Sequence, residues 1–246
     1  MRLDRVQGFH KSSTGMVLSL ALAVGAMTSA RVAVNGVASR GSLPQETGAL
    51  LQRIAGLPLS FERNEGQVGD DVRLASRGAG YGLYLTPQRA VLALAPAGRN
   101  GADERAARGV AVGMRLAGSN PNPAIQGVDS LPGKLNYFLG NDASQWKTGV
   151  ETYRKALYKD VYPGIDLIYY GNQKELEYDF VVAPGGDPGA IELVFEGVTG
   201  ATLNEAGDLI LETASGPVRQ KRPVAYQTID GRRTDVFSEY RLLGCQ

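Results

Sequence analysis

The sequence predicts an all-β protein with an antiparallel, β-sandwich-like architecture of many short strands and hairpins. From residue 57 onward, apolar and polar residues alternate with a period of two, as they do on a half-buried strand. Turn-forming residues interrupt these runs about every eight to twelve positions, a spacing typical of sandwiches and barrels. The chain has 32 glycines, and its β-branched and aromatic residues fall in short runs between glycines and prolines. These three features indicate short strands joined by tight turns.

The first strands are expected before residue 119. Residues 81–86 and 90–95 alternate as two strands around Pro87 and Gln88, which predicts a hairpin. A loop over 96–109 and a strand over 110–116 follow. The run SNPNP at 119–123 then breaks the chain, because proline removes a backbone donor and constrains the residue before it. This break is the expected boundary between two packed lobes, at 57–118 and 130–246.

A second hairpin is expected over 165–182. Residues 165–170 and 174–182 predict its strands, with Gly171 and Asn172 at the turn. Alternate residues of the returning strand lie on opposite faces, which separates Leu176, Tyr178 and Phe180 from Glu175, Glu177 and Asp179. One face of this sheet is therefore expected to be buried.

The remaining strands form a series of hairpins. Residues 191–195 begin a strand, and 201–204 pairs with 209–213 around Gly207. Residues 224–229 and 233–243 are expected to pair around Asp230-Gly231, a dipeptide that suits a type I′ turn.

The first thirty residues have the three parts of a bacterial secretory signal. A basic start precedes an apolar stretch over 15–26, and cleavage is expected after Ala26 or Ala30. The apolar stretch is shorter than the roughly 20 residues of a membrane-spanning helix, which favours a cleavable signal helix over an anchor. Residues 31–56 predict a flexible lead into a β-rich domain over 57–246. The protein is expected to be secreted or held at the cell surface, in contact with the membrane only through its transient signal.

Composition excludes several kinds of chemistry. The only histidine, His10, lies in the signal, so the exported region has none for a Ser-His-Asp triad, a Cys-His pair or a histidine metal site. The formal net charge of +1 gives no support to nucleic-acid binding. The single cysteine, Cys245, cannot form an intramolecular disulfide. The run GAGYG at 78–82 lacks the lysine of a phosphate-binding loop, and no acidic spacing matches a calcium loop. No cofactor and no metal site is expected.

Acidic residues on the paired strands leave one catalytic alternative open. Glu177 and Asp179, with Asp166 on the neighbouring strand, would supply the acid and the nucleophile of a carbohydrate-active enzyme. Alternating acidic residues more commonly lie on the solvent-exposed face of a strand. A cleft holding Glu177 and Asp179 with a shifted pKa would favour the enzyme, and an open face would oppose it.

Aromatic residues are dense between positions 137 and 170. Exposed tryptophan and tyrosine rings are surfaces on which sugars and protein partners stack. The candidate binding residues are Trp146, its neighbours Asn141 and Asp142, and Tyr169 and Tyr170. Complete burial of Trp146 would remove the best of these candidates.

Several long motifs occur in a fixed order along the chain. They are NEGQ at 64–67, LPGKLNYFLGND at 131–142, Trp146, VYPGIDLIYYGN at 161–172 and LEYDFVVAPG at 176–185. Together they resemble the N-terminal domain of unknown function found ahead of SBBP (β-propeller type) repeats in large secreted bacterial proteins. The resemblance covers about residues 57–243. It implies an extracellular setting and a β-rich fold, with no established activity and no catalytic residues to carry over. Relative to this family the sequence ends early, where further strands and then the repeats would continue.

These observations favour a noncatalytic structural or interaction module over an enzyme. In the family architecture, its partners are the following β-propeller repeats, together with a glycan or a surface protein. The alternatives are a carbohydrate-binding domain and a carboxylate-dependent carbohydrate-active enzyme. The structural hypothesis also predicts an apolar, poorly covered surface near Leu242.

Overall fold

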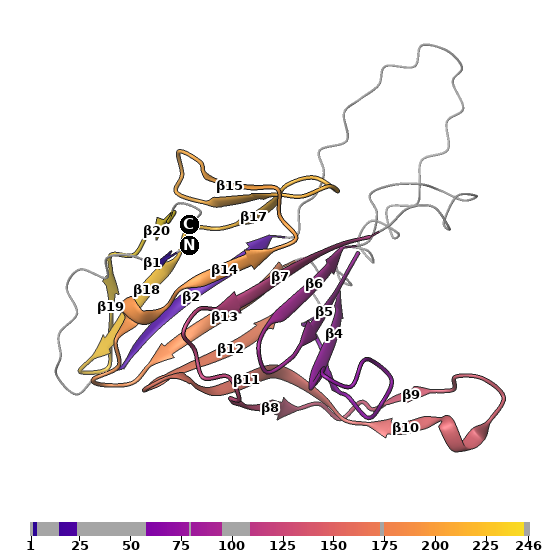
Figure 1. Cartoon of the computed structure of the whole chain (residues 1–246). Coiled ribbons are helices and arrows are strands. Elements are labelled where there is room, and N and C mark those ends of the chain that lie inside the picture. Colours follow the sequence, from indigo (N-terminus) through magenta and orange to yellow (C-terminus); the bar gives the residue numbers. More distant parts are fainter. Residues whose placement is uncertain are drawn as a thin grey trace, which may run out of the picture.

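The computed structural model describes residues 2–3, 15–23, 58–78, 80–94, 109–172 and 175–243. Within these residues the protein is nearly all antiparallel β, which confirms the predicted fold class (Figure 1). The expected loop over 96–109, except Gly109, the lead over 31–56 and the cleavage sites after Ala26 and Ala30 lie outside the described residues.

The first part of the chain forms an antiparallel meander. Its strands follow one another in the sheet and are β3 (Phe61–Arg63), β4 (Leu74–Gly78), β5 (Tyr81–Leu85), β6 (Ala90–Leu94) and β7 (Val110–Leu116). Leu83 pairs with Leu92 in the β5–β6 hairpin, and both side chains are buried. The hairpin predicted from the alternating residues after position 80 is therefore confirmed.

The middle part contributes four long strands. They are β8 (Ala124–Ser130), β11 (Thr152–Tyr162), β12 (Ile165–Gly171) and β13 (Glu175–Val182), and β11 pairs with both β8 and β12. The predicted alternation in β13 is confirmed, because Leu176, Tyr178 and Phe180 are buried while the acidic residues between them are partly exposed. Gly171 has φ of 145°, and a Cβ there would lie 2.2 Å from the Glu175 carbonyl oxygen. This turn therefore requires glycine.

The C-terminal part returns to both edges of the sheet. It contains the 3-10 helix η2 (Pro188–Ala190) and the strands β14 (Leu193–Glu196), β15 (Gly200–Leu203), β16 (Leu209–Glu212), β17 (Val218–Gln220), β18 (Val224–Ile229), β19 (Arg232–Val236) and β20 (Tyr240–Arg241). Asp230 and Gly231 both have positive φ, 50° and 74°, as the predicted type I′ turn requires. The strand predicted over 233–243 is shorter in the structure and ends at Val236.

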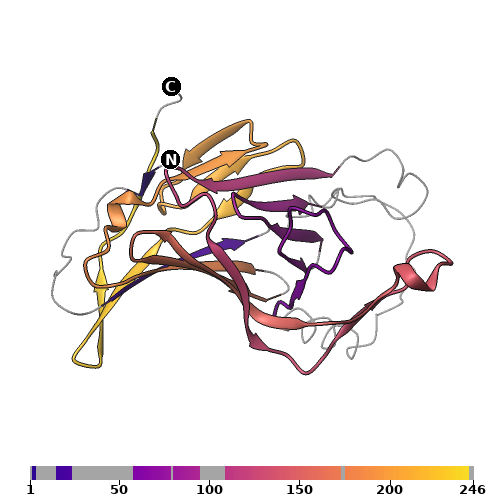
Figure 2. The ribbon, with the colours of Figure 1, turned by 60° about the horizontal axis from the view of Figure 1, so that its bottom comes forward.

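One hydrogen-bonded sheet of 16 strands includes strands from both predicted lobes. Its main path runs β14-β7-β6-β5-β4-β3-β11-β12-β13-β2-β17-β16-β15. The sheet curls so that its parts face one another like the layers of a sandwich (Figure 2). The Tyr158 and Tyr162 hydroxyls donate across this core to the carbonyls of Thr86 and Ala117, at 2.9 and 2.8 Å.

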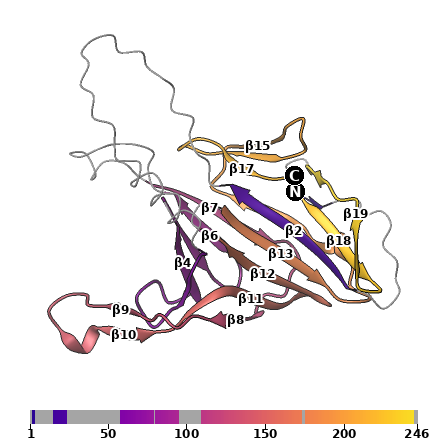
Figure 3. The ribbon, with the colours of Figure 1, turned by 180° about the vertical axis from the view of Figure 1, so that it is seen from behind.

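Strand β2 (Met16–Ala23) lies inside the sheet, between β13 on one side and β17 and β18 on the other (Figure 3). The prediction of a signal helix was wrong for these residues, because they are extended. Periodicity does not separate a helix from a strand over so short an apolar run. Pairing to two strand edges stabilises the extended form, and every residue of β2 pairs with β13. The short strand β1 (Arg2–Leu3) pairs with β20.

The inward side chains of β2 are part of the hydrophobic core. Met16, Leu18, Leu20 and Leu22 are 0, 1, 1 and 8% exposed. Burial of such side chains contributes about 1.5–3 kcal/mol each, so the four together contribute on the order of 6–12 kcal/mol. Strand β2 is therefore a structural component of this sheet.

Candidate binding surface

A hairpin projects from the body of the sheet (Figure 2). Its strands are β9 (Leu135–Tyr137) and β10 (Lys147–Val150), which pair only with each other among the described strands, and the 3-10 helix η1 (Ala143–Gln145) lies at its tip. Asp142 caps η1, since its Oδ1 accepts hydrogen bonds from the Ser144 backbone N–H at 2.9 Å and the Ser144 hydroxyl at 2.7 Å. These bonds lower the pKa of Asp142.

Large apolar side chains gather on this hairpin in contact with solvent. Leu135, Phe138, Leu139 and Trp146 are 40, 61, 60 and 39% exposed. The rings of Phe138 and Trp146 meet edge to face, with centroids 5.1 Å apart. Trp146 donates from Nε1 to the Gly140 carbonyl at 3.2 Å, which orients its indole. We call Phe138, Leu139 and Trp146 the apolar tip; Leu135 pairs with Val150 and lies nearer the body of the sheet. An exposed group of this kind is typical of a contact surface for another molecule.

The base of the hairpin is held by a buried acid. Glu62 on β3 is 2% exposed and accepts hydrogen bonds from Arg77 at 2.6 Å and from the Tyr137 hydroxyl. Arg77 also donates to the Tyr137 oxygen at 2.5 Å. Partial burial and the bond to Glu62 raise the pKa of Tyr137. The apolar tip is thus carried on an anchored element.

The candidate catalytic carboxylates occupy the outward face of the sheet. Glu177 and Asp179 are alternate residues of β13, and their side chains lie on the face opposite the buried Tyr178 and Phe180. Burial raises the pKa of both groups, with a further contribution for Glu177 from Glu175 and Asp179.

Each of the three candidate acids has local partners, and Tyr170 hydrogen-bonds to Glu177. The Tyr170 hydroxyl donates to Asp179 at 2.9 Å, and Asp166 accepts from Lys159 Nζ at 2.6 Å and from the Asp160 backbone N–H at 2.8 Å. The hollow under the hairpin is lined by other residues, among them Arg63, Glu65, Lys134, Trp146 and Lys147. Shifted pKa values are present here, but the acids do not line that hollow.

A family comparison covers most of this architecture. A family model described as "Domain of unknown function (DUF7948)" matches residues 61–246, from β3 through the C-terminal strands. The chain belongs to this family. No curated protein and no solved structure matched the chain.

The DUF7948 fold separates the five predicted binding residues into two groups. Asn141, Asp142 and Trp146 lie together on the projecting hairpin. Tyr169 is only 2% exposed and packs in the core against Tyr158 and Tyr178. Tyr170 is half-buried on the outward face beside Asp179. The structure therefore does not bring the two tyrosines to the surface that carries Trp146.

Phe138 and Leu139 of the apolar tip were not among the binding residues predicted from the sequence. Leu135, Phe138 and Leu139 lie in the run LNYFL, between the turn-forming residues Pro132-Gly133 and Gly140-Asn141. An apolar run this close to two turn signals is a sign of a short exposed hairpin. Four further apolar side chains of the DUF7948 domain, Val224, Phe237, Leu242 and Leu243, are 45, 55, 38 and 42% exposed. Leu242 and Leu243 are thus themselves exposed, and the apolar surface expected near Leu242 stays a prediction.

The described part of the chain lacks two further features. No group of three or more His, Cys, Asp or Glu side chains is placed there to hold a metal ion. No helix in the same residues is long and apolar enough to cross a membrane.

Proposed function

We propose that this DUF7948 chain is a noncatalytic structural and interaction module of an exported bacterial protein, positioned ahead of β-propeller-type repeats. The observation that carries this proposal is the anchored hairpin with its apolar tip. Phe138 and Leu139 expose about three-fifths of their surface, while Glu62, Arg77 and Tyr137 hold the base. A rigid element that exposes apolar side chains loses little conformational entropy when it binds.

The hairpin is the proposed contact with the repeats. The full chain is titrated with a purified SBBP-type β-propeller repeat segment, and binding is measured by calorimetry. We expect Phe138→Ser and Trp146→Ser to weaken binding at least about tenfold, because aromatic anchors dominate interface energies. Leu203→Ser is the matched control, since Leu203 is 39% exposed on β15, away from the hairpin. Unchanged binding by both hairpin variants, or a loss only in Phe237→Ser, would contradict the proposal.

The carbohydrate alternatives are measured in parallel. Trp146 is the observation that favours glycan binding, because its indole is partly exposed and fixed in orientation. Binding to a glycan array that is lost in Trp146→Ala would replace the protein contact by a glycan contact. Hydrolysis of a glycoside panel that is lost in Asp179→Asn would show an enzyme.

A further inference from the structure

Strand β2 fills a slot between two strand edges. On one side all its residues pair with β13, and on the other Met16 to Ser19 pair with β18 while Leu22 and Ala23 pair with β17. The Lys221 backbone N–H donates to the Ala21 carbonyl at 2.8 Å and closes the gap between β17 and β18. The residues that pair with β2 all lie more than 150 positions further along the chain. The slot is therefore formed by distant segments, and β2 enters it as a separate strand.

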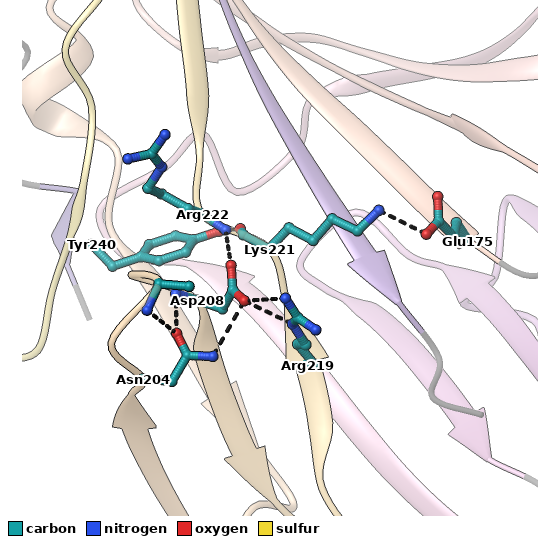
Figure 4. A network of polar contacts seen from close by, with 8 residues as sticks. Glu175, Asn204, Asp208, Arg219, Lys221, Arg222 and Tyr240 are labelled. Atoms are coloured by element: carbon teal, nitrogen blue, oxygen red, sulfur yellow. Dashed lines mark hydrogen bonds and ion pairs between the residues drawn. The ribbon is translucent and has the colours of Figure 1, made fainter. Parts of the chain in front are cut away.

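The wall of the slot is held by its own polar network (Figure 4). Asp208 accepts from Arg219 Nε at 2.7 Å and from the Arg222 backbone N–H at 2.8 Å. Lys221 reaches across β2 to Glu175 on β13, at 2.7 Å. None of the side chains in these bonds comes from β2. The network therefore positions the wall independently of which strand fills the slot.

Strand β2 leaves one buried polar group on the inward side of the slot without a hydrogen bond. The Gln227 side chain on β18 is 2% exposed, and within the described residues its Nε2 has no hydrogen-bond partner. Gln227 pairs directly with Met16, so the two side chains lie on the same face. A buried amide without an acceptor is costly. The slot thus favours a hydrogen-bond acceptor at the position that Met16 occupies.

The outward side is acidic along β13. Ala21 lies opposite Glu177, and Ser19 lies opposite Asp179 and hydrogen-bonds to its carboxylate. Opposite charges at directly paired positions of neighbouring strands stabilise a sheet, and like charges destabilise it. The slot therefore favours donors or cations at the outward positions of its occupant, where β2 offers Ala21.

We propose that this slot is a strand-acceptor site that, once the leader is removed on export, binds an extended segment of a partner polypeptide. The segment carries aliphatic residues at alternate inward positions, an acceptor opposite Gln227 and basic residues opposite Glu177. The inference rests on the proposed export, in which cleavage after Ala26 or Ala30 removes β2. Because every exported copy loses β2, a second copy of the protein cannot supply the missing strand. Main-chain pairing to an open sheet edge is an established mode of peptide recognition.

The test uses the full chain with a protease site inserted between Gly41 and Ser42, cleaved after folding. A labelled peptide that copies residues 15–23, with lysines added at its ends for solubility, is added in urea, and the urea is then diluted. We expect the peptide to replace the N-terminal fragment at one per molecule. The matched control carries Leu18→Asp and Leu20→Asp and should not bind. Failure of the first peptide, or equal binding of the control, would overturn the proposal.

Peptide variants then test the outward chemistry. We expect Ala21→Lys to bind about threefold tighter and Ala21→Glu about threefold weaker, so that the two differ by about tenfold. The same substitutions at Val17 should change affinity less than twofold, because Val17 lies opposite the uncharged Val181. Equal affinities of the two Ala21 variants would show that the acidic row does not select the occupant.

A second pair of variants tests the inward chemistry. We expect Met16→Gln to bind more tightly than Leu18→Gln, because its carbonyl oxygen can accept from Gln227. Leu18→Gln should bind about tenfold more weakly than the parent peptide, because it buries an amide among aliphatic side chains. Equal losses in the two variants would overturn the assigned acceptor position.

The outcomes separate this proposal from the proposed function. Hairpin variants such as Phe138→Ser should leave peptide binding unchanged, because the hairpin and the slot are different elements. Loss of repeat binding with intact peptide binding would remove the hairpin function and keep the strand-acceptor site. Mass spectrometry of the exported protein gives its first residue. An exported chain that still contains Met16 to Ala23 would overturn the proposal.

Discussion

Asp208 is the most completely paired acid among the described residues of the slot wall. It is 4% exposed and is hydrogen-bonded by Asn204, Arg219 and the Arg222 backbone N–H. Burial alone would disfavour its charge, but the hydrogen bonds and the Arg219 guanidinium outweigh that effect and lower its pKa. The charged form of this side chain is therefore the one that stabilises the fold.

The sign of the pH dependence follows from this lowered pKa. The stabilisation from Asp208 is present above the pKa of the unfolded chain, near 3.8, and is lost as the pH falls through the lower folded-state value. We expect Asp208→Asn to lower the free energy of unfolding by about 2 kcal/mol at pH 7, because it removes charge-assisted hydrogen bonds. Urea titrations at pH 7 and pH 3 should show the difference between variant and wild type shrinking at pH 3. A difference that does not change with pH would contradict this account.

At the scale of elements, the β9–β10 hairpin depends on its anchor. Among the described strands its two strands pair only with each other, and an isolated hairpin is only marginally stable in water. The bonds of Tyr137 to Glu62 and Arg77 therefore stabilise the hairpin in the position seen here.

Removing the Tyr137 hydroxyl should loosen the hairpin while the sheet remains intact. We expect Tyr137→Phe to lower the local opening free energy of the hairpin by about 1–2 kcal/mol, measured by native-state amide exchange at Gly149 and Val150. Exchange in β13 should not change. Tyr226→Phe is the matched control, because it keeps the ring that lies 3.9 Å from the Arg233 guanidinium. Equal exchange in the two variants would contradict an anchoring role.

At the scale of the whole molecule, β2 joins strands that are far apart in the sequence. Its neighbours begin at residue 175 on one side and extend to residue 227 on the other. Removing a buried aliphatic side chain from such a strand weakens the sheet as a whole, because the strand pairs with segments that are distant in sequence on both sides.

A substitution at Leu20 tests how much β2 contributes to the stability of the full chain. We expect Leu20→Ala to lower the free energy of unfolding by about 2–5 kcal/mol, through lost burial and the cavity left behind. Val17→Ala on the outward, partly exposed face should cost less than about 1 kcal/mol. Urea denaturation of both variants, with the leader intact, gives the comparison. Equal losses would place β2 outside the core.

The sequence alone determined the local architecture. Alternation fixed the faces of β13, glycine and the Asp230-Gly231 dipeptide placed the turns, and the hairpins after residues 80 and 164 formed as predicted. The position of Trp146 on an exposed surface was also predictable, because turn signals surround it.

Only the tertiary structure decided the remaining features. Residues 16–23 are compatible with a helix or a strand by periodicity, and two distant strand edges selected the strand. That Tyr169 packs against Tyr158 and Tyr178, on strands to either side of its own, was likewise decided by the order of the strands. Strand period and turn chemistry are properties of neighbouring residues, and the sequence contains them directly. Strand order depends on pairing between segments that are distant in sequence, more than 150 positions for β2, which local patterns do not encode.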